Sequence, residues 1–163
     1  MNVNSQTGRQ VELILNEFEK KVFVNHSETL LHTLREKLGL MGAKPGCKNG
    51  DCGSCTILLD GTPINACHIL TVEAIDYHIT TIEGLKDSTV QNAFIQEWAI
   101  QCGYCTPGLI LNCYALAETD PNATEDQINE WLDSNICRCT GYMEIKEAIK
   151  HVLQARRSYG KHA

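Results

Sequence analysis

The sequence predicts an α+β chain, in which a small β-sheet packed on one helix is followed by a group of four helices. Three observations support this fold class. Before residue 82, apolar and polar residues alternate in several short segments, which is the period of a strand. After the segment 83–88 the apolar spacing becomes helical. Each half of the chain also contains its own group of cysteines. We therefore expect two domains, at residues 1–82 and 83–163.

Composition and charge exclude several classes of function. The 163 residues are 43% hydrophobic but 6% aromatic, so aliphatic side chains must fill most of the core. The net charge of −6 argues against a nucleic-acid-binding protein. No apolar run approaches the roughly 18–20 residues of a membrane span, and the polar N-terminal segment lacks an export signal. Nine cysteines without such a signal indicate a cytoplasmic protein whose thiols bind metal.

The first domain begins with a predicted β-hairpin. Residues 1–9 are expected to form a loose polar leader. Apolar residues then alternate with polar ones from Val11 to Leu15, with one exception, and again over 21–25. The intervening segment 16–20 is the turn candidate, so the two strands read as a hairpin.

A helix is predicted after this hairpin. Ser27 is a plausible N-cap, and the leucine spacing gives one apolar face, made of Leu30, Leu34 and Leu38. Gly39 suits the position just past the helix end, where the left-handed conformation is common.

Three further strands complete the predicted sheet. The segment 56–64 reads as a strand, a turn at Asp60-Gly61 and a return strand. The segment 78–82 is a fifth strand candidate. This order of elements predicts a β-grasp, ferredoxin-like domain over residues 1–82.

Four amphipathic helices are predicted in the second domain. The first has an apolar face made of Val90, Phe94 and Trp98. In the second, Thr106 can cap the helix and Pro107 can occupy its first position, ahead of an apolar face over 109–117. Thr124 and Gln127 form a capping box for the third helix. The fourth covers 145–153, and the polar tail from Arg156 is expected to fray, which together predict a four-helix bundle.

The first cysteine group lies in a glycine-rich loop and comprises Cys47, Cys52, Cys55 and Cys67. The first three have the spacing C-x4-C-x2-C, with which plant-type ferredoxins bind a [2Fe-2S] cluster. Gly46, Gly50 and Gly53 interleave with these cysteines, as a tight loop requires. Zinc is the main alternative, but zinc sites usually use two short C-x2-C pairs. An odd number of cysteines makes a disulfide framework a poor explanation.

The second group comprises Cys102, Cys105, Cys137 and Cys139, in the segments QCGYCTPG and CRCTGY. Each segment leads into a predicted helix, whose positive N-terminal dipole would stabilise a negatively charged thiolate cluster. The alternatives are a zinc site or a redox C-x2-C pair, and a redox pair leaves two of the four cysteines unexplained. Cys113 lies on the apolar face of its helix, so we interpret it as a buried thiol.

At these segments the chain resembles the iron–sulfur subunits of the molybdenum hydroxylases, a family that includes xanthine dehydrogenase, aldehyde oxidoreductase and aerobic carbon monoxide dehydrogenase. The resemblance covers about residues 10–155 and is carried by three segments, CKNGDCGSCTILLDG, QCGYCTPG and NICRCTGY. The departures are mild: Tyr104 stands where Phe is usual, and Ser54 where Ala is usual.

The resemblance implies an electron-transfer role, with no catalytic residues on this chain. Two [2Fe-2S] clusters would be bound by the eight cysteines of the two groups. A large subunit would carry a molybdenum–pterin cofactor and perform the hydroxylation, and a medium subunit would carry FAD. Electrons would pass through the helical-domain cluster and then the β-grasp cluster to FAD, and Gln101 and Cys139 would lie nearest the pterin.

Several functional alternatives stay open at this point. Xanthine is the expected substrate of the complex, and aldehydes, nicotinate-type heterocycles and carbon monoxide are the alternatives within the family. A free-standing two-cluster electron carrier is a second hypothesis. A zinc module without redox function is a third.

Overall fold

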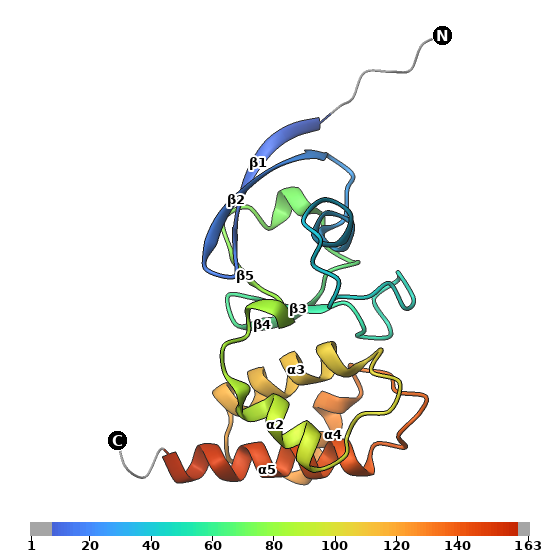
Figure 1. Ribbon diagram of the computed structural model, residues 1–163, viewed down its shortest axis with the longest axis vertical. Helices are drawn as coiled ribbons and strands as arrows, with labels where there is room; N and C mark the ends of the chain where they lie inside the picture. The colour runs from blue at the N-terminus through green and yellow to red at the C-terminus, as the bar shows by residue number, and fades with distance from the viewer. Residues whose placement is uncertain (1–7, 160–163) are drawn as a thin grey trace.

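Residues 8–159, the part of the chain that the computed structural model describes, form a mixed five-stranded sheet and five helices (Figure 1). The predicted α+β class is therefore confirmed. The sheet and a short helix occupy one half, and the four longer helices occupy the other. Residues 1–7 of the predicted leader and the last four residues of the predicted frayed tail lie outside the described residues.

The sheet has the strand order β2-β1-β5-β3-β4. β1 and β5 are parallel, whereas the other neighbouring strands are antiparallel. The strands are β1 (Gly8–Leu15), β2 (Phe18–Asn25), β3 (Thr56–Leu59), β4 (Thr62–Asn65) and β5 (His78–Thr80). Two 3-10 turns, Thr71–Glu73 and Ile82–Gly84, flank β5, so this strand is shorter than its predicted range.

Two tight turns set the register of the hairpins. Asn16 and Glu17 have φ angles of 51° and 71°, the left-handed conformation that two-residue hairpin turns require. The predicted five-residue turn was therefore too long, and Phe18 already belongs to β2. Residues 8–9 belong to β1 rather than to a leader, because polar side chains on the exposed part of this ribbon hid the strand period. The predicted Asp60-Gly61 turn is confirmed, with φ angles of 47° and 80°.

The first helix starts two residues later than predicted. α1 (Leu30–His32) continues as a π-helical turn at Thr33–Lys37. Its N-cap is Thr29, whose hydroxyl accepts a hydrogen bond from the His32 amide at 3.3 Å, so the assignment to Ser27 was wrong. Gly39 has a φ angle of 69° just past the helical segment, as predicted.

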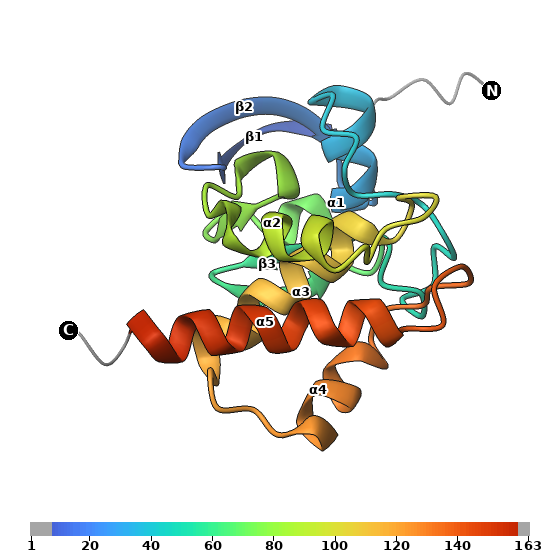
Figure 2. The same ribbon diagram turned by 60° about the horizontal axis from the view of Figure 1, so that its bottom comes forward.

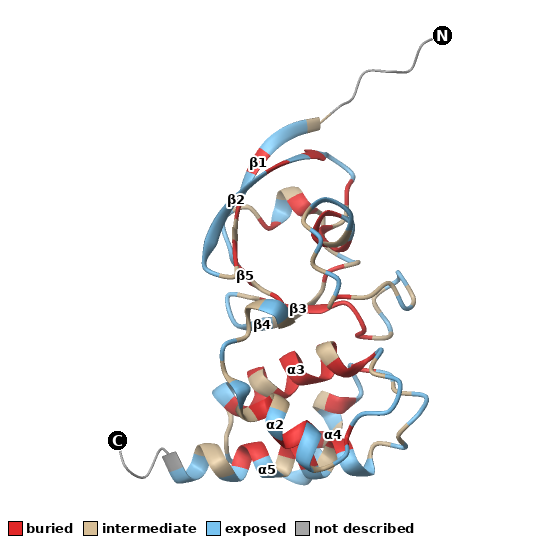
Figure 3. Cartoon of the chain, in the orientation of Figure 1, coloured by how far each residue is buried: buried red, intermediate tan, exposed pale blue. Residues whose placement is uncertain are grey.

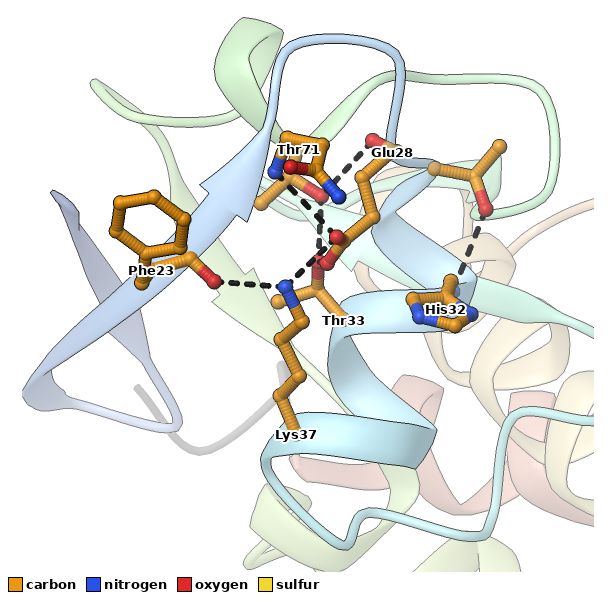
Figure 4. A network of polar contacts seen from close by, with 8 residues as sticks. Phe23, Glu28, His32, Thr33, Lys37 and Thr71 are labelled. Carbon is orange, nitrogen blue, oxygen red and sulfur yellow. Dashed lines mark hydrogen bonds and ion pairs between the residues drawn. The ribbon is translucent and has the colours of Figure 1, made fainter. Parts of the chain in front are cut away.

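A buried carboxylate links this helix to the sheet (Figure 4). Glu28 accepts hydrogen bonds from the Thr33 hydroxyl at 2.6 Å and from the Lys37 ammonium at 2.7 Å. Lys37 also donates to the carbonyl of Phe23 on β2 at 2.7 Å, and the Thr33 and Thr71 hydroxyls lie 2.7 Å apart. Burial alone would raise the pKa of Glu28, but the hydrogen bonds from Lys37 and Thr33 outweigh it and lower that pKa.

Four helices follow the sheet: α2 (Ser88–Gln96), α3 (Thr106–Thr119), α4 (Glu125–Leu132) and α5 (Met143–Tyr159). Figure 2 shows α5 running beneath α3, with α4 below it. The Thr124–Gln127 capping box of α4 is confirmed. Thr106 was wrongly assigned as a cap, because Cys105 occupies the N-cap position of α3. α5 continues through the segment 156–159, which was expected to fray. No helix within residues 8–159 is long and apolar enough to cross a membrane.

Trp98 lies outside the core, contrary to the prediction. Val90 and Phe94 of α2 are fully buried, but the helix ends at Gln96 and Trp98 is 84% exposed. Its φ angle is 55°, so the chain turns at this point and carries the indole away from the apolar face.

Separate apolar cores fill the two halves of the chain (Figure 3). The sheet core lies between the strands and the leucines of the first helix. The helical core contains most of the inward faces of α2, α3, α4 and α5. The halves join where Leu58 of β3 packs against Leu111 and Ala115 of α3. This contact fixes the sheet against the helices and brings the cysteine loops of the two halves to the same side (Figures 1 and 2).

Candidate metal centres

The N-terminal cysteine loop provides one thiol that is prepared for ionisation. Cys47 Sγ accepts hydrogen bonds from the amides of Asn49, at 3.5 Å, and Cys52, at 3.4 Å. The Asn49 amide has the largest effect, and with the Cys52 amide it lowers the pKa of Cys47 to about 6. Amide donors directed at sulfur are typical of loops that hold thiolates at a metal centre.

One thiol of this loop lies deeper than the other three. Cys55 is 2% exposed, and burial raises its pKa to about 12. Cys55 interacts directly with Cys67, and the Cys47 thiol interacts likewise with Cys52. The four predicted N-terminal ligands therefore come together as two neighbouring pairs of thiols.

Glycine is required in this loop by close contacts. A Cβ atom at Gly46 would lie 2.5 Å from Cys52 Sγ, so any side chain there would displace the thiol. Gly50 and Gly53 have φ angles of 89° and 65°, a conformation that other residues adopt at a cost. These contacts explain why glycines interleave with the cysteines.

The C-terminal thiols also form two pairs. Cys102 and Cys139 are exposed, with their Sγ atoms 3.6 Å apart. Cys105 is buried and interacts with Cys137, and burial, followed by this neighbour, raises the pKa of Cys105 to about 12. Burial opposes ionisation of Cys137, but hydrogen bonds from Thr140, whose hydroxyl lies 3.1 Å from Cys137 Sγ, lower the Cys137 pKa.

Two residues that the sequence analysis missed connect the cysteine loops. Asn135 is 1% exposed, and its side chain donates to the carbonyl of Gly53 at 2.9 Å. The Ile136 amide donates to the carbonyl of Cys52 at 3.0 Å, so one hydrogen bond joins the residue preceding Cys137 to an N-terminal cysteine. No spacing rule identifies these partners, because they meet only through the packing of β3 on α3.

Glycines permit this close approach as well. A Cβ atom at Gly108 would lie 2.3 Å from the Gly53 carbonyl oxygen, and one at Gly53 would lie 2.1 Å from Asn135 Nδ2. Gly108, the last residue of the QCGYCTPG segment, thus allows α3 to contact the N-terminal cysteine loop.

Tyr142 fixes the second C-terminal segment from within. Its hydroxyl accepts a hydrogen bond from the Cys137 amide at 2.7 Å and donates one to the Asn135 carbonyl at 3.1 Å. This clip closes the turn between Asn135 and α5 and orients Cys137. The tyrosine was visible in the CRCTGY segment, but its role depends on a left-handed φ angle of 70° that the sequence does not indicate.

The two remaining candidate residues differ in exposure, because Gln101 lies at the surface and Cys113 lies in the core. Gln101 is exposed beside Cys102 at the surface of the helical half. Cys113 is 2% exposed within the helical core, and burial raises its pKa to about 12, in agreement with its interpretation as a core thiol.

The donor set fits an iron–sulfur cluster at each position. A [2Fe-2S] cluster bound by four cysteines takes two thiolates on each iron, and both groups present two adjacent pairs. Within residues 8–159, no group of three or more His, Cys, Asp or Glu side chains is placed so that it could hold a single metal ion. The cradle at Gly46 and the amide donors at Cys47 supply the space and polarity that a thiolate loop needs.

Comparison with known families assigns both halves of the chain to iron–sulfur domains. Residues 14–76 match the family described as "2Fe-2S iron-sulfur cluster binding domain". Residues 81–150 match the family described as "[2Fe-2S] binding domain". Together the two matches include all eight predicted ligands.

Individual relatives match most of the chain. The "Nicotinate dehydrogenase small FeS subunit" of Eubacterium barkeri is 38% identical over 148 residues, which are 88% of this chain and 94% of that protein. A probable xanthine dehydrogenase subunit from Bacillus subtilis is 46% identical over 112 residues, 67% of this chain and 65% of that protein. A crystal structure of quinoline 2-oxidoreductase from Pseudomonas putida 86 aligns with a TM-score of 0.87 at 36% identity, covering 93% of this chain and 98% of that chain.

Proposed function

The chain belongs to the iron–sulfur subunits of the molybdenum hydroxylase family, and we propose that it relays electrons between partner subunits of a heteromeric oxidoreductase. The observation that carries this proposal is the meeting of two four-cysteine groups at one hydrogen-bonded junction. A [2Fe-2S] cluster supplies one-electron redox chemistry when bound. The protein supplies the thiolates, their hydrogen bonds and a short connection between the loops.

The proposed ligands of the N-terminal cluster are Cys47, Cys52, Cys55 and Cys67. The proposed ligands of the helical-half cluster are Cys102, Cys105, Cys137 and Cys139. The first set lies in what we interpret as a β-grasp domain, residues 1–82, and the second in a four-helix bundle, residues 83–163. Cluster binding should also stabilise the folded protein, because the unfolded chain does not hold the four thiols of a site together.

We propose the direction of electron transfer from the resemblance to the family, and the exposure of two thiols supports the place of the first contact. Cys102 and Cys139 are the exposed thiols of the helical half, so a partner can approach them closely. We propose that Gln101 and Cys139 face the molybdenum–pterin cofactor of a large subunit. Electrons then cross the Cys52–Ile136 junction to the N-terminal loop and leave for FAD in a medium subunit. No residue of this chain acts on substrate, and a cytoplasmic location accords with thiols reserved for metal.

The substrate class is proposed from the relatives. Three of them are named for nicotinate, xanthine and quinoline, which are nitrogen-containing heteroaromatic compounds, and others are named for aldehydes. We propose hydroxylation of a nitrogen-containing heteroaromatic compound by the complex, with xanthine as the expected substrate. Nicotinate-type compounds, aldehydes and carbon monoxide are the alternatives.

The relay is tested by removing one ligand from each group. In the assembled enzyme, Cys52→Ser should abolish the N-terminal EPR signal, while substrate still reduces the helical-half cluster. Cys137→Ser should abolish the helical-half signal and prevent substrate from reducing the N-terminal cluster. Cys113→Ala is the matched control, because it also removes a thiol but should leave both signals intact.

Two outcomes would contradict the proposal. Normal turnover with the physiological acceptor in Cys52→Ser would show that the N-terminal cluster is not on the path. The alternative of a free-standing carrier would be favoured if the chain purified without any large partner and still transferred electrons to added acceptors.

A further inference from the structure

Lys44 extends from the N-terminal cysteine loop toward the helical half. Its amide donates to the Ser54 carbonyl at 2.9 Å, and its carbonyl accepts from the Gly46 amide at 3.0 Å, so its backbone is part of the loop. Its ammonium lies 5.8 Å from the centre of the Tyr104 ring, in cation–π contact. Tyr104 stands between Cys102 and Cys105. The charge of Lys44 is therefore held between the two cysteine groups.

The surroundings of Lys44 keep this charge partly out of water. The side chain is half-buried, and its ammonium donates to the Gly42 carbonyl at 3.0 Å. Burial and the nearby Arg35 guanidinium lower the pKa of Lys44, and Glu83 and Cys105 oppose this shift only in part. Tyr104 immediately precedes Cys105, so the Lys44 ammonium lies beside a proposed ligand of the helical-half cluster. A half-buried charge is screened less by solvent and salt than an exposed one.

We propose that the positive charge of Lys44 raises the reduction potential of the helical-half cluster. This inference rests on the proposed function. Reduction adds one electron to a cluster and makes it more negative, so a fixed positive charge nearby stabilises the reduced form. The cation–π contact with the Tyr104 ring helps to hold the ammonium in place. The N-terminal domain thereby adjusts a cluster that it does not ligate, and it does so only when the two halves are packed together.

The test is a mediated potentiometric titration of the intact complex, with dithionite as the electron donor and each cluster followed by its EPR signal. The signals are assigned with Cys52→Ser and Cys137→Ser, which each remove one of them. Lys44→Met keeps the length of the side chain and removes its charge, and it should shift the helical-half midpoint potential to a more negative value. Lys44→Arg retains the charge and should leave that potential close to the wild-type value.

Lys48→Met is the matched control. Lys48 lies in the same loop but is exposed, and it lines a surface pocket with Thr29, His32 and Cys67. Removing its charge should leave the helical-half potential unchanged. Tyr104→Leu should shift this potential in the same direction as Lys44→Met, because the ammonium loses the cation–π contact that holds it in place.

The outcomes separate this inference from the proposed function. An unchanged helical-half potential in Lys44→Met, with both EPR signals present, would overturn the role of Lys44 and leave the relay intact. Equal shifts in Lys44→Met and Lys44→Arg would also overturn it, because packing rather than charge would then be responsible. Failure to find two [2Fe-2S] signals in the wild-type protein would instead overturn the proposed function.

Discussion

The side chain of Asn135 donates a hydrogen bond to the carbonyl of Gly53 across 2.9 Å, although 82 positions separate the two residues. Asn135 is almost fully buried, and its own carbonyl oxygen Oδ1 accepts from Asn112 on α3 at 2.8 Å. Asn112 in turn donates to the Trp131 carbonyl at 2.9 Å at the end of α4. One amide therefore connects the N-terminal cysteine loop to two helices.

Asn135→Ala should destabilise the protein by roughly 1–3 kcal/mol, because the substitution leaves buried polar groups without their partner. Urea unfolding followed by circular dichroism measures the change. Asn92→Ala on the exposed face of α2 is the control and should change the stability by less than about 0.5 kcal/mol. Equal effects of the two substitutions would contradict the assigned role of Asn135.

Glu28→Gln should alter the response of stability to pH. The folded protein lowers the Glu28 pKa below its ordinary value of 4.5, so the unfolded state takes up this proton more readily. The stability that Glu28 contributes is therefore present above pH 4.5 and is lost as pH falls from that value through the folded pKa.

Thermal unfolding of wild type and Glu28→Gln at several pH values checks this sign. The wild type should be the more stable protein at pH 7, and the difference should narrow as the pH falls below 4.5. Acid-induced loss of metal is common to both proteins and cancels in the comparison. A difference that widens toward low pH would show that Glu28 is not held ionised by Lys37 and Thr33.

Trp98→Gly should stabilise the chain by roughly 0.5–1 kcal/mol, since glycine adopts the left-handed conformation without steric cost. The φ angle of Trp98 is 55°, and the indole is 84% exposed, so little packing is lost. The shift of the thermal midpoint is the measurement. Trp98→Ala removes the indole but keeps the strain, and a gain of the same size in that variant would rule out backbone strain as the cause.

Cys113→Ala should retain both clusters and cost roughly 1–2 kcal/mol, as a small truncation in a core does. Cys113 is enclosed by the helical core, where its thiol is kept protonated by burial. Iron content and the EPR spectrum provide the check. Loss of either EPR signal would identify Cys113 as a misassigned ligand.

Local patterns were sufficient to predict much of this structure. The Asp60-Gly61 turn, the Thr124–Gln127 capping box and the glycine after the first helix follow from rules that involve only neighbouring residues. Local rules failed at two positions where other contacts, or the end of a helix, decided the structure. Thr29 rather than Ser27 caps α1, because Glu28 is drawn to Thr33 and Lys37, and Trp98 leaves the apolar face because α2 ends before it.

The candidate ligands were predicted from spacing, whereas their surroundings were not. Cysteine spacing reflects the geometry of a loop around metal, which is encoded within a few residues. The contacts of Asn135 with Gly53, of Ile136 with Cys52 and of Lys44 with Tyr104 join segments far apart in the chain. They depend on how α3 packs against β3, for which a single sequence offers no short-range signal.

The central claim is that this chain binds two [2Fe-2S] clusters through eight cysteines. Metal and acid-labile sulfide analysis of anaerobically purified protein tests this claim most directly. The account predicts about four iron and four sulfide per chain. Zinc at about two per chain without sulfide would contradict it.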